Sequence, residues 1–528
     1  MDQEPTAIKT DALNRRDLVK LMAMGAAGAL GLPALALAAG EKTLVWGKKL
    51  EATMYDPATS ILASSWELLH LVYEGLTNLD ANMKPVPALA ESWETPSPTK
   101  YVFKLRRGVK FSNGRELTVD DAVGSLRRLI DPKTGSFFAG QMGKIKSISA
   151  SGAHALTIEL AEPYAPLLTA LASTMASIIP MKELAAGSFD PSKTLLGTGP
   201  YAVQSHAQGD NWTLERNAHY WQPGLPKIAR LVVKIVPNDQ ALIAGLRDGG
   251  IDIAQFDASP DAKLLLTPLA NVQVVQNQQT NLIWLVLNAV AKGSPFANPK
   301  VRQAVALALD RDTIAKVGMG GSGAPATAIA PAFHAVDPAR LKVYKRDVEK
   351  AKALLKEAGA TGLGFEVVTG SEPIWAAIGQ VMQESLAQAG ITVKLATLDE
   401  GTLVKRVWIA NPGDFQASLL WYAGYSDPAM LPLWFVPKVA GFTAGYQAED
   451  PELIKAIEGL RALDAADPHR AAAIQDVCDR IHTQANQIPV ITRVETMAFR
   501  KDVLQAAAMS HVDGYADSLH GVATYTKS

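Results

Sequence analysis

Residues 101–121 constrain the fold more than any other stretch, because a strand, a tight turn and the start of a helix follow one another there. Side chains of the first six residues alternate between two faces, with Tyr101, Phe103 and Leu105 sharing one of them. This period of two is typical of a half-buried strand. Asn113-Gly114 then predicts a tight turn, because both residue types tolerate positive φ.

A helix is predicted directly after this turn. Thr118 is followed three residues later by Asp121, a spacing typical of a capping-box N-terminus, and first-turn aspartates suit the positive end of a helix dipole. Asp131-Pro132 predicts the end of the helix. One predicted face is apolar and consists of Ala122, Val123, Leu126, Leu129 and Ile130. The stretch therefore indicates mixed α and β structure.

Strands and helices continue to alternate along the chain, which predicts an α/β fold. Strands are predicted at 43–46, 155–160, 201–204, 229–236, 281–288, 365–369, 391–395, 415–420 and 488–491. Helices are predicted from Pro163-Tyr-Ala-Pro166 to about Ala176, and at 239–248, 299–311, 348–358, 374–389, 402–409, 452–465 and 469–484.

Composition excludes several classes of protein. The chain has 528 residues, which is too long for one core and corresponds to about three domain-sized units. It is 48% apolar and 20% charged, with a formal net charge of −1, so neither a nucleic-acid binder nor a membrane-surface protein is indicated. The single cysteine, Cys478, excludes an intrachain disulfide and a cysteine metal cluster. Its helical spacing from Ile474, Val477 and Ile481 predicts a buried thiol.

Residues 1–38 resemble an export signal. Arg15-Arg16 lies in a segment similar to the twin-arginine motif, residues 21–38 are apolar, and small residues around Ala38 predict a cleavage site. An uncleaved membrane anchor is the alternative, but 18 residues are marginal for spanning a bilayer. No cysteine lies near the junction, so lipid attachment is not expected. We therefore predict a diffusible exported protein, most simply periplasmic.

The stretch from residue 89 to residue 121 contains the pattern LA-S-W, Y-F-LR-GVKF-NGR and LT-DD, which resembles the signature of the extracytoplasmic solute-binding proteins of family 5. Gly197-Thr-Gly-Pro-Tyr201 and the segment around Arg302 resemble further motifs of that family. Its members are the dipeptide- and oligopeptide-binding components of ABC importers, with nickel- and opine-binding relatives. The resemblance covers residues 44–503.

The resemblance implies a two-lobed periplasmic binding protein of the large type II class, with a hinge and an inserted extra subdomain. Lobe I is then expected to comprise 41–82, 199–283 and 498–528, and the inserted subdomain 83–198. Lobe II is expected to comprise 284–497, and the hinge is expected near 280–285 and 495–500.

No catalytic or metal-binding pattern is present. The histidines form no HExxH motif, His482 and His511 belong to no recognised metal-ligand motif, and no serine lies in a GxSxG motif. Residues 318–323 read GMGGSG, but a predicted helix precedes them, whereas a dinucleotide loop needs a preceding strand. We predict no enzyme activity, no metal and no cofactor. Arg302 and Arg311 are interpreted as structural ion-pair residues.

The strongest ligand candidates lie in Trp421-Tyr-Ala-Gly-Tyr-Ser-Asp-Pro428. Trp421, Tyr422 and Tyr425 combine flat apolar rings with polar tips and suit a small ligand, although ordinary core packing explains them equally well. Asp427 precedes a proline and is interpreted as a turn residue or, alternatively, a ligand contact. From the resemblance, four more residues are expected to face the cleft: Trp46, Tyr55, Asn281 and Trp284.

Gly424 departs from the family pattern. In the peptide-binding relatives the corresponding position is an aspartate that pairs with the α-ammonium of the ligand. A buried ammonium without that partner would lose about 2–5 kcal/mol. The substitution therefore questions a free peptide as the ligand.

The resulting hypothesis is a monomeric binding protein that captures a small, peptide-like solute by lobe closure and delivers it to an ABC permease. The alternatives are an opine or other non-peptide solute, a nickel or other metal chelate, and a secreted hydrolase. No nucleic-acid partner is expected.

Overall fold

The structure is a computed structural model. It describes residues 42–256, 259–321, 323–327, 344–422, 425–437, 442–503 and 519–527. The predicted export signal, His511 and Gly424 lie outside these ranges. No helix within the described ranges has the length and apolar character needed to cross a membrane.

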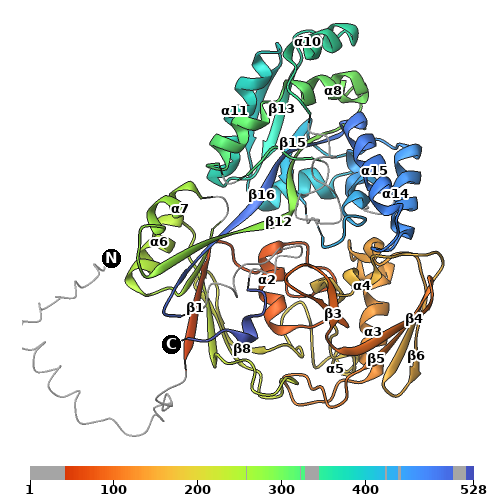
Figure 1. The fold of residues 1–528 in the computed structure, drawn as a ribbon, viewed down its shortest axis with the longest axis vertical. Helices are drawn as coiled ribbons and strands as arrows, with labels where there is room; N and C mark the ends of the chain where they lie inside the picture. The colour runs from red at the N-terminus through yellow and green to blue at the C-terminus, as the bar shows by residue number, and fades with distance from the viewer. Residues whose placement is uncertain are drawn as a thin grey trace, which may run out of the picture. The chain divides into compact units, whose positions relative to one another are not determined.

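Ten of the described strands form one mixed sheet, which confirms the predicted α/β class (Figure 1). Their order across the sheet is β14 (Thr392–Thr397), β13 (Gly364–Thr369), β15 (Ala417–Trp421), β12 (Val272–Leu287), β16 (Gln487–Arg500), β11 (Ile253–Phe256), β1 (Thr43–Lys48), β10 (Arg230–Ile235), β9 (Asn211–Arg216) and β8 (Tyr201–Ala207). The order does not follow the sequence, so segments far apart in the chain become neighbours.

Two long antiparallel strands, β12 and β16, connect the two halves of this sheet. Val272 to Gln278 pairs with Arg500 to Val494, next to β11, and the pairing resumes from Leu282 opposite Thr492, next to β15. The register shifts between Gln278 and Leu282, and such irregularities bend and twist a strand pair locally. The part built on β11, β1, β10, β9 and β8 is called lobe I. The part built on β15, β13 and β14 is called lobe II.

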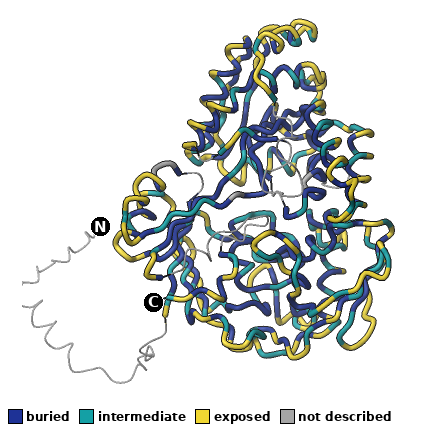
Figure 2. The backbone as a smooth tube through the Cα atoms, in the orientation of Figure 1, coloured by how far each residue is buried: buried dark blue, intermediate teal, exposed yellow. Residues whose placement is uncertain are grey.

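Lobe II surrounds its strands with helices whose outer faces are exposed and whose inner faces are buried (Figure 2). The helices are α8 (Pro299–Ala308), α9 (Arg311–Thr313), α10 (Val348–Glu357), α11 (Pro373–Ala387), α12 (Glu400–Val404), α14 (Pro451–Ala462) and α15 (Arg470–Gln484). Short single-turn or π-helical segments lie at Ile314–Gly318 (η5), Lys405–Ile409 (η7), Leu431–Phe435 (η8) and Phe442–Gly445 (η9). Cys478 is buried on α15, as predicted.

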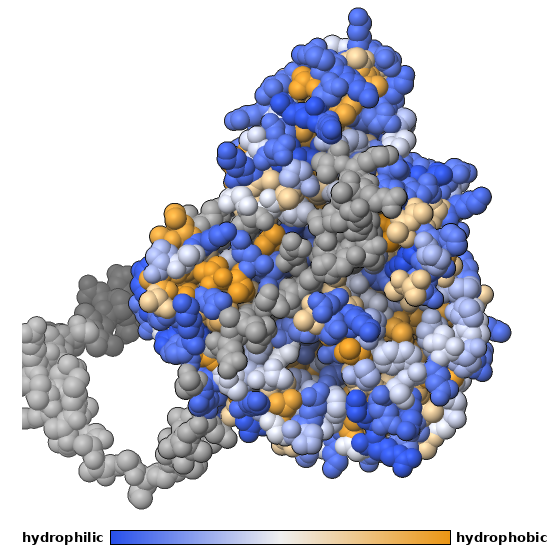
Figure 3. All heavy atoms as spheres, viewed as in Figure 1, coloured by the Kyte–Doolittle hydropathy of each residue, from blue (hydrophilic) through white to orange (hydrophobic). Residues whose placement is uncertain are grey.

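Lobe I packs α2 (Ala63–Val72), α6 (Asp239–Asp248) and α7 (Pro260–Leu266) around its strands. The visible surface is mostly hydrophilic, but apolar residues gather over α6 and α7 in Figure 3, where Leu264 and Leu265 are exposed. The described C-terminal residues, including η11 (Val522–Thr524), pack against the same lobe through Val522 and Tyr525.

A separate four-stranded antiparallel sheet lies within residues 83–198. Its order is β4 (Ala90–Ser97), β5 (Lys100–Leu105), β7 (Ala155–Leu160) and β6 (Ile145–Gly152). The helix α3 (Val119–Ile130) has the predicted capping box, with Thr118 and Asp121 bonding each other's backbone N–H. We call this sheet and the elements next to it the small-sheet part. The smaller elements are β2 (Thr77–Leu79), just before residue 83, β3 (Pro85–Pro87), α4 (Leu167–Ala170), α5 (Met181–Ala185) and the turns at Pro132–Thr134, Ala139–Met142 and Thr174–Ala176.

Three predictions need correction. The helix predicted up to Ala176 ends after one turn, because the chain becomes extended at Ser173, whose hydroxyl donates to the carbonyl of Ala170. The predicted strands 281–288 and 488–491 are parts of much longer strands, β12 and β16. Arg302 and Arg311 are structural, but each donates to backbone carbonyl oxygens and, in the described part of the chain, pairs with no carboxylate.

Candidate ligand-binding site

A pocket with about 1180 Å³ of empty space, including its open mouth, lies between the two lobes. Lobe I contributes the segment 61–66 at the start of α2, and the neighbouring small-sheet part contributes Phe137. Lobe II contributes most of the remaining lining, from 370–375, 400–409, 419–422 and Trp434. We call this space the interlobe pocket. A ligand held there would contact residues on both sides of the strands that join the lobes.

Parallel pairing explains why the lobe II residues meet. β13 pairs in parallel with both β14 and β15, so the carboxyl ends of the three strands lie at one edge of the sheet. Gly370 to Trp375 follows β13, Glu400 follows β14, and Trp421 ends β15. Ligands of open α/β sheets characteristically bind outside the carboxyl ends of the strands.

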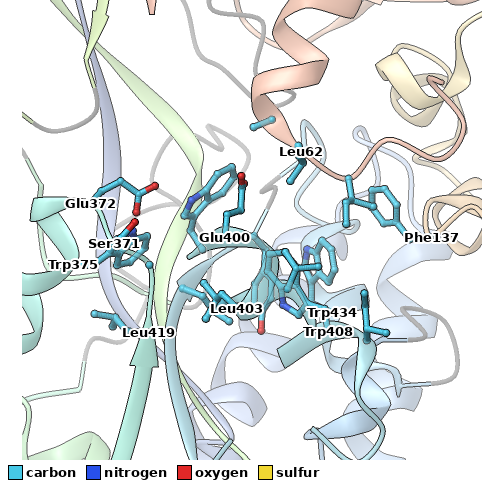
Figure 4. A pocket seen from close by; sticks show the side chains of 18 of the residues that line it. Leu62, Phe137, Ser371, Glu372, Trp375, Glu400, Leu403, Trp408, Leu419 and Trp434 are labelled. Carbon is cyan, nitrogen blue, oxygen red and sulfur yellow. The ribbon is translucent and has the colours of Figure 1, made fainter. Parts of the chain in front are cut away.

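Aromatic rings form a large part of the pocket wall (Figure 4). On the lobe I side, Trp66 and Phe137 are stacked with ring centroids 6.3 Å apart, and the Trp66 indole N–H donates to the carbonyl of Ser60 at 3.1 Å. On the lobe II side the lining rings are Trp375, Trp408, Trp421, Tyr422 and Trp434. Such rings offer a large apolar contact surface that is rigid because it has few rotatable bonds.

A stack of three rings joins two rings of the lobe II wall to one buried ring behind them. Trp434 lies between Tyr422, at 4.8 Å and 15° between ring planes, and Tyr425, at 5.8 Å and 6°. The Tyr422 and Tyr446 hydroxyls are 2.9 Å apart. Burial raises the pKa of the Tyr422 and Tyr425 phenols well above the ordinary value, so these groups are neutral hydrogen-bonding groups and carry no charge into the wall.

Two carboxylates, Glu372 and Glu400, are the charged groups among the described residues that line the pocket. Glu372 lies at the N-cap of α11 but makes no capping hydrogen bond, and Glu400 is in the first turn of α12. Within the described ranges neither side chain has a hydrogen-bond or ion-pair partner. Desolvation and the nearby charge of Glu372 raise the pKa of Glu400. The pocket is therefore apolar, aromatic and negatively charged.

The residues predicted around Trp421 have different positions. Trp421 and Tyr422 line the pocket, whereas Tyr425 is fully buried behind it and has a φ of 54°. The Tyr425 ring also packs edge-on against Phe138 of the small-sheet part, at 5.7 Å, which joins this part to lobe II. Gly424 lies outside the described residues.

Asp427 is held within lobe II. It accepts a hydrogen bond from the backbone N–H of Ala429 at 2.7 Å, which is the turn geometry that was predicted. Its carboxylate also pairs with the buried guanidinium of Arg470 at 2.5 Å. These partners account for Asp427 without a ligand.

The other four predicted contacts are not among the described residues that line the pocket. Trp46 is in the core of lobe I, and Tyr55 packs edge-on against Trp212 at 5.3 Å. Trp284 is fully buried in β12. Asn281 is buried where the register of β12 shifts, and its side-chain oxygen has no hydrogen-bond partner in the described part of the chain. A ligand role for these four residues stays a prediction.

Sequence reasoning missed most of the lining: Trp66, Phe137, Glu372, Trp375, Glu400, Trp408 and Trp434. These residues share no local motif. One available signal was their position after predicted strands, at 370–375 and 400, but it becomes informative only when the strands are known to be parallel neighbours.

The described residues contain no group of three or more His, Cys, Asp or Glu side chains placed to hold a metal ion. His482 packs against the Tyr344 ring at 4.3 Å. Burial raises the pKa of the Cys478 thiol to about 12, which removes its nucleophilic form at neutral pH.

Comparisons with known proteins place this pocket in context. The family model for bacterial extracellular solute-binding proteins, family 5, matches residues 84–441. The glutathione-binding protein GsiB of Escherichia coli O1:K1 is 28% identical, over 92% of this chain and 94% of its own. Two solved structures share the fold. The binding protein AgaA of A. tumefaciens R10, in complex with agropinic acid, has a TM-score of 0.80 at 24% identity and covers 92% of this chain and 98% of its own. DppA of Helicobacter pylori, in complex with the peptide STSA, has a TM-score of 0.81 at 23% identity and covers 92% of this chain and 99% of its own.

Proposed function

Because the chain belongs to the bacterial extracellular solute-binding proteins of family 5, we propose that it captures a small solute in the interlobe pocket and delivers it to the transmembrane subunits of an ABC importer. The observation that carries this proposal is the position of the pocket. Its lining comes from both lobes, and the lobes are joined by β12 and β16.

The binding mechanism follows from this geometry. A ligand that contacts Trp66 on one side and Trp421 on the other gains its full interaction energy only when the lobes are together. It therefore shifts the population toward the closed state. The proposed hinge lies near 280–285 and 495–500. The register shift between Gln278 and Leu282 reaches the first of these segments, and a local break in strand pairing can absorb a change in backbone angles.

Within this class we propose a peptide-like ligand. The relative GsiB is named for glutathione, and the DppA structure contains a peptide. The pocket has the aromatic walls that bind flat or apolar side chains. An opine or other non-peptide solute is the second candidate, because AgaA binds agropinic acid and because Gly424 occupies the position where the family's peptide binders have an aspartate. A metal would have to arrive as a chelate.

We further propose that the protein is exported and acts as a monomer in the periplasm. Residues 1–38 support export, since they combine Arg15-Arg16 with an apolar segment and small residues near Ala38. Replacing Arg15 and Arg16 by lysine is expected to leave the uncleaved protein in the cytoplasm. Cell fractionation of tagged full-length chains measures this. Unchanged export would exclude the twin-arginine route.

The function is tested with the protein from residue 40 onward. A thermal-shift screen with dipeptides, tripeptides, glutathione, N-blocked peptides and opines is expected to identify a stabilising compound, since a ligand at 100 times its Kd adds about 2.7 kcal/mol to the native state. Solution scattering at saturating ligand is expected to show a smaller radius of gyration.

The variant Trp421→Ala is expected to abolish the stabilisation, whereas Trp93→Ala, on β4 and outside the pocket lining, is expected to retain it. Stabilisation that survives in Trp421→Ala would place the ligand elsewhere. Binding without a change in the scattering profile would contradict lobe closure.

A further inference from the structure

We propose that the ligand of the interlobe pocket carries an alkylammonium or guanidinium group, and that Glu372 and Glu400 bind this cation among the aromatic rings. The inference rests on the proposed function, because it assumes that the pocket is the ligand site. It adds the chemical class of the ligand and assigns the recognition of its charge to two residues that no sequence motif marks.

The charge balance of the pocket is the first argument. Glu372 and Glu400 line a wall that is otherwise mainly apolar, and neither has a partner of opposite charge among the described residues. Glu372 is half-buried and Glu400 is exposed in the empty pocket, and two like charges near each other raise the free energy of that state. Partial desolvation and the charge of Glu372 raise the pKa of Glu400. A ligand cation would relieve the repulsion and form charge-assisted hydrogen bonds.

The packing of Glu372 is the second argument. A Cβ at Gly370 would lie 2.6 Å from Glu372 Oε2 and 3.0 Å from the Trp375 ring. The absence of a side chain at Gly370 thus leaves room for the Glu372 carboxylate and the pyrrole edge of the Trp375 indole. Figure 4 shows Glu372 next to Trp375, with Glu400 between this pair and Phe137 in the view. Aromatic rings attract organic cations through their faces, and carboxylates add charge-assisted hydrogen bonds.

One indole of this wall already binds a guanidinium in the structure. The guanidinium carbon of Arg493, on β16, lies 4.1 Å from the centroid of the Trp421 ring. Arg493 is not among the described lining residues, and within the described ranges no ion pair joins it to Glu372 or Glu400. The contact shows that the Trp421 face accepts a planar cation.

A structural role of the two carboxylates makes a different prediction. Acidic residues at helix N-termini stabilise the helix dipole, and Glu372 and Glu400 lie at the starts of α11 and α12. In that case their charge would affect the stability of the protein but not the choice between a charged and an uncharged ligand. The ratio of two affinities, measured in the same variant, separates the two roles.

The test uses three pairs of dipeptides, each pair differing by one positive charge: Ala-Ala and N-acetyl-Ala-Ala, Ala-Arg and Ala-citrulline, and Ala-Lys and Ala-norleucine. Titration calorimetry gives the Kd of each compound. For at least one pair, the charged member is expected to bind about 10–100-fold more tightly to the native protein, as for a charge-assisted hydrogen bond. This ratio is expected to fall toward one in the double variant Glu372→Gln, Glu400→Gln.

Glu384→Gln is the matched control, because Glu384 is exposed on the same helix α11 and lies outside the pocket lining. It is expected to retain the full ratio. If the double variant does not fold, the single variants carry the test, and each is expected to lower the ratio.

Equal binding of the charged and neutral members would overturn the inference and leave the proposed function intact. A ratio that persists in the glutamine variants would overturn the assignment to Glu372 and Glu400. Binding of none of the six compounds would also overturn the inference as stated, and the wider thermal-shift screen then decides the proposed function separately.

Discussion

Replacing Glu74 by glutamine should change how the stability of the protein depends on pH. Glu74 connects segments that are far apart in the sequence. Its carboxylate accepts hydrogen bonds from the Thr198 hydroxyl at 2.8 Å, from the Trp221 indole N–H at 3.0 Å and from the Tyr220 hydroxyl at 3.3 Å. Desolvation by burial outweighs these bonds and raises the pKa of Glu74 from 4.5 to about 7.

The sign of the effect follows from this shift. A carboxyl group with a raised pKa binds its proton more tightly in the folded state than in the unfolded state. Its protonation therefore stabilises the protein fully below pH 4.5, and this contribution is lost as the pH rises through 7. With these two pKa values the loss between pH 5 and pH 8 is about 2.5 kcal/mol. Glu74 retains some exposed surface, so solvent screening makes this an upper value.

Glu74→Gln removes this titration and keeps an oxygen acceptor for Trp221. We expect the free energy of unfolding of the variant, relative to the native protein, to rise by up to about 2.5 kcal/mol between pH 5 and pH 8. Urea unfolding at four pH values measures the difference. The control Glu94→Gln, at an exposed position of β4, should run parallel to the native protein. Parallel curves for Glu74→Gln as well would refute the reasoning.

Two further predictions concern lobe II. Trp434→Ala is expected to lower the free energy of unfolding by about 3–5 kcal/mol, because the buried indole is stacked against Tyr425 and a second tyrosine ring. Urea unfolding measures this loss, and Trp408→Ala, at a less buried position of the same wall, should lower the free energy of unfolding clearly less. Equal losses in the two variants would argue against a stabilising role of the stack. Asp427→Asn is expected to cost about 3 kcal/mol, because it leaves the buried Arg470 without its counter-charge. Adding Arg470→Met should recover part of that loss in a double-mutant cycle, and strictly additive losses would show that the pair is not coupled.

Local interactions account for what the sequence predicted correctly. The capping box of Thr118 and Asp121, the burial of Cys478 on its helix and the turn at Asp427 each depend on residues within four positions of one another. Such patterns can be recognised in the sequence because the residues that form them are close together along the chain. The resemblance to family 5 also depends on continuous stretches of sequence, and the family model confirms it.

Long-range pairing determined what the sequence left open. The length of β12 and β16 follows from their pairing with each other across more than 200 positions, which supports the polar residues 276–278 as a strand. A local pattern cannot show such pairing, and intrinsic strand propensity is weak beside it.

The sequence by itself determined the α/β class, the family and the aromatic segment at Trp421. Only the tertiary structure decided which residues share a pocket with Trp421. The parallel order β14-β13-β15 places the carboxyl ends of three strands at one edge, so that Glu372 and Glu400, 28 positions apart in the chain, line one space opposite Trp66. The physical reason is that a pocket is formed by the order in which strands pair, whereas a motif records only which residues are neighbours along the chain.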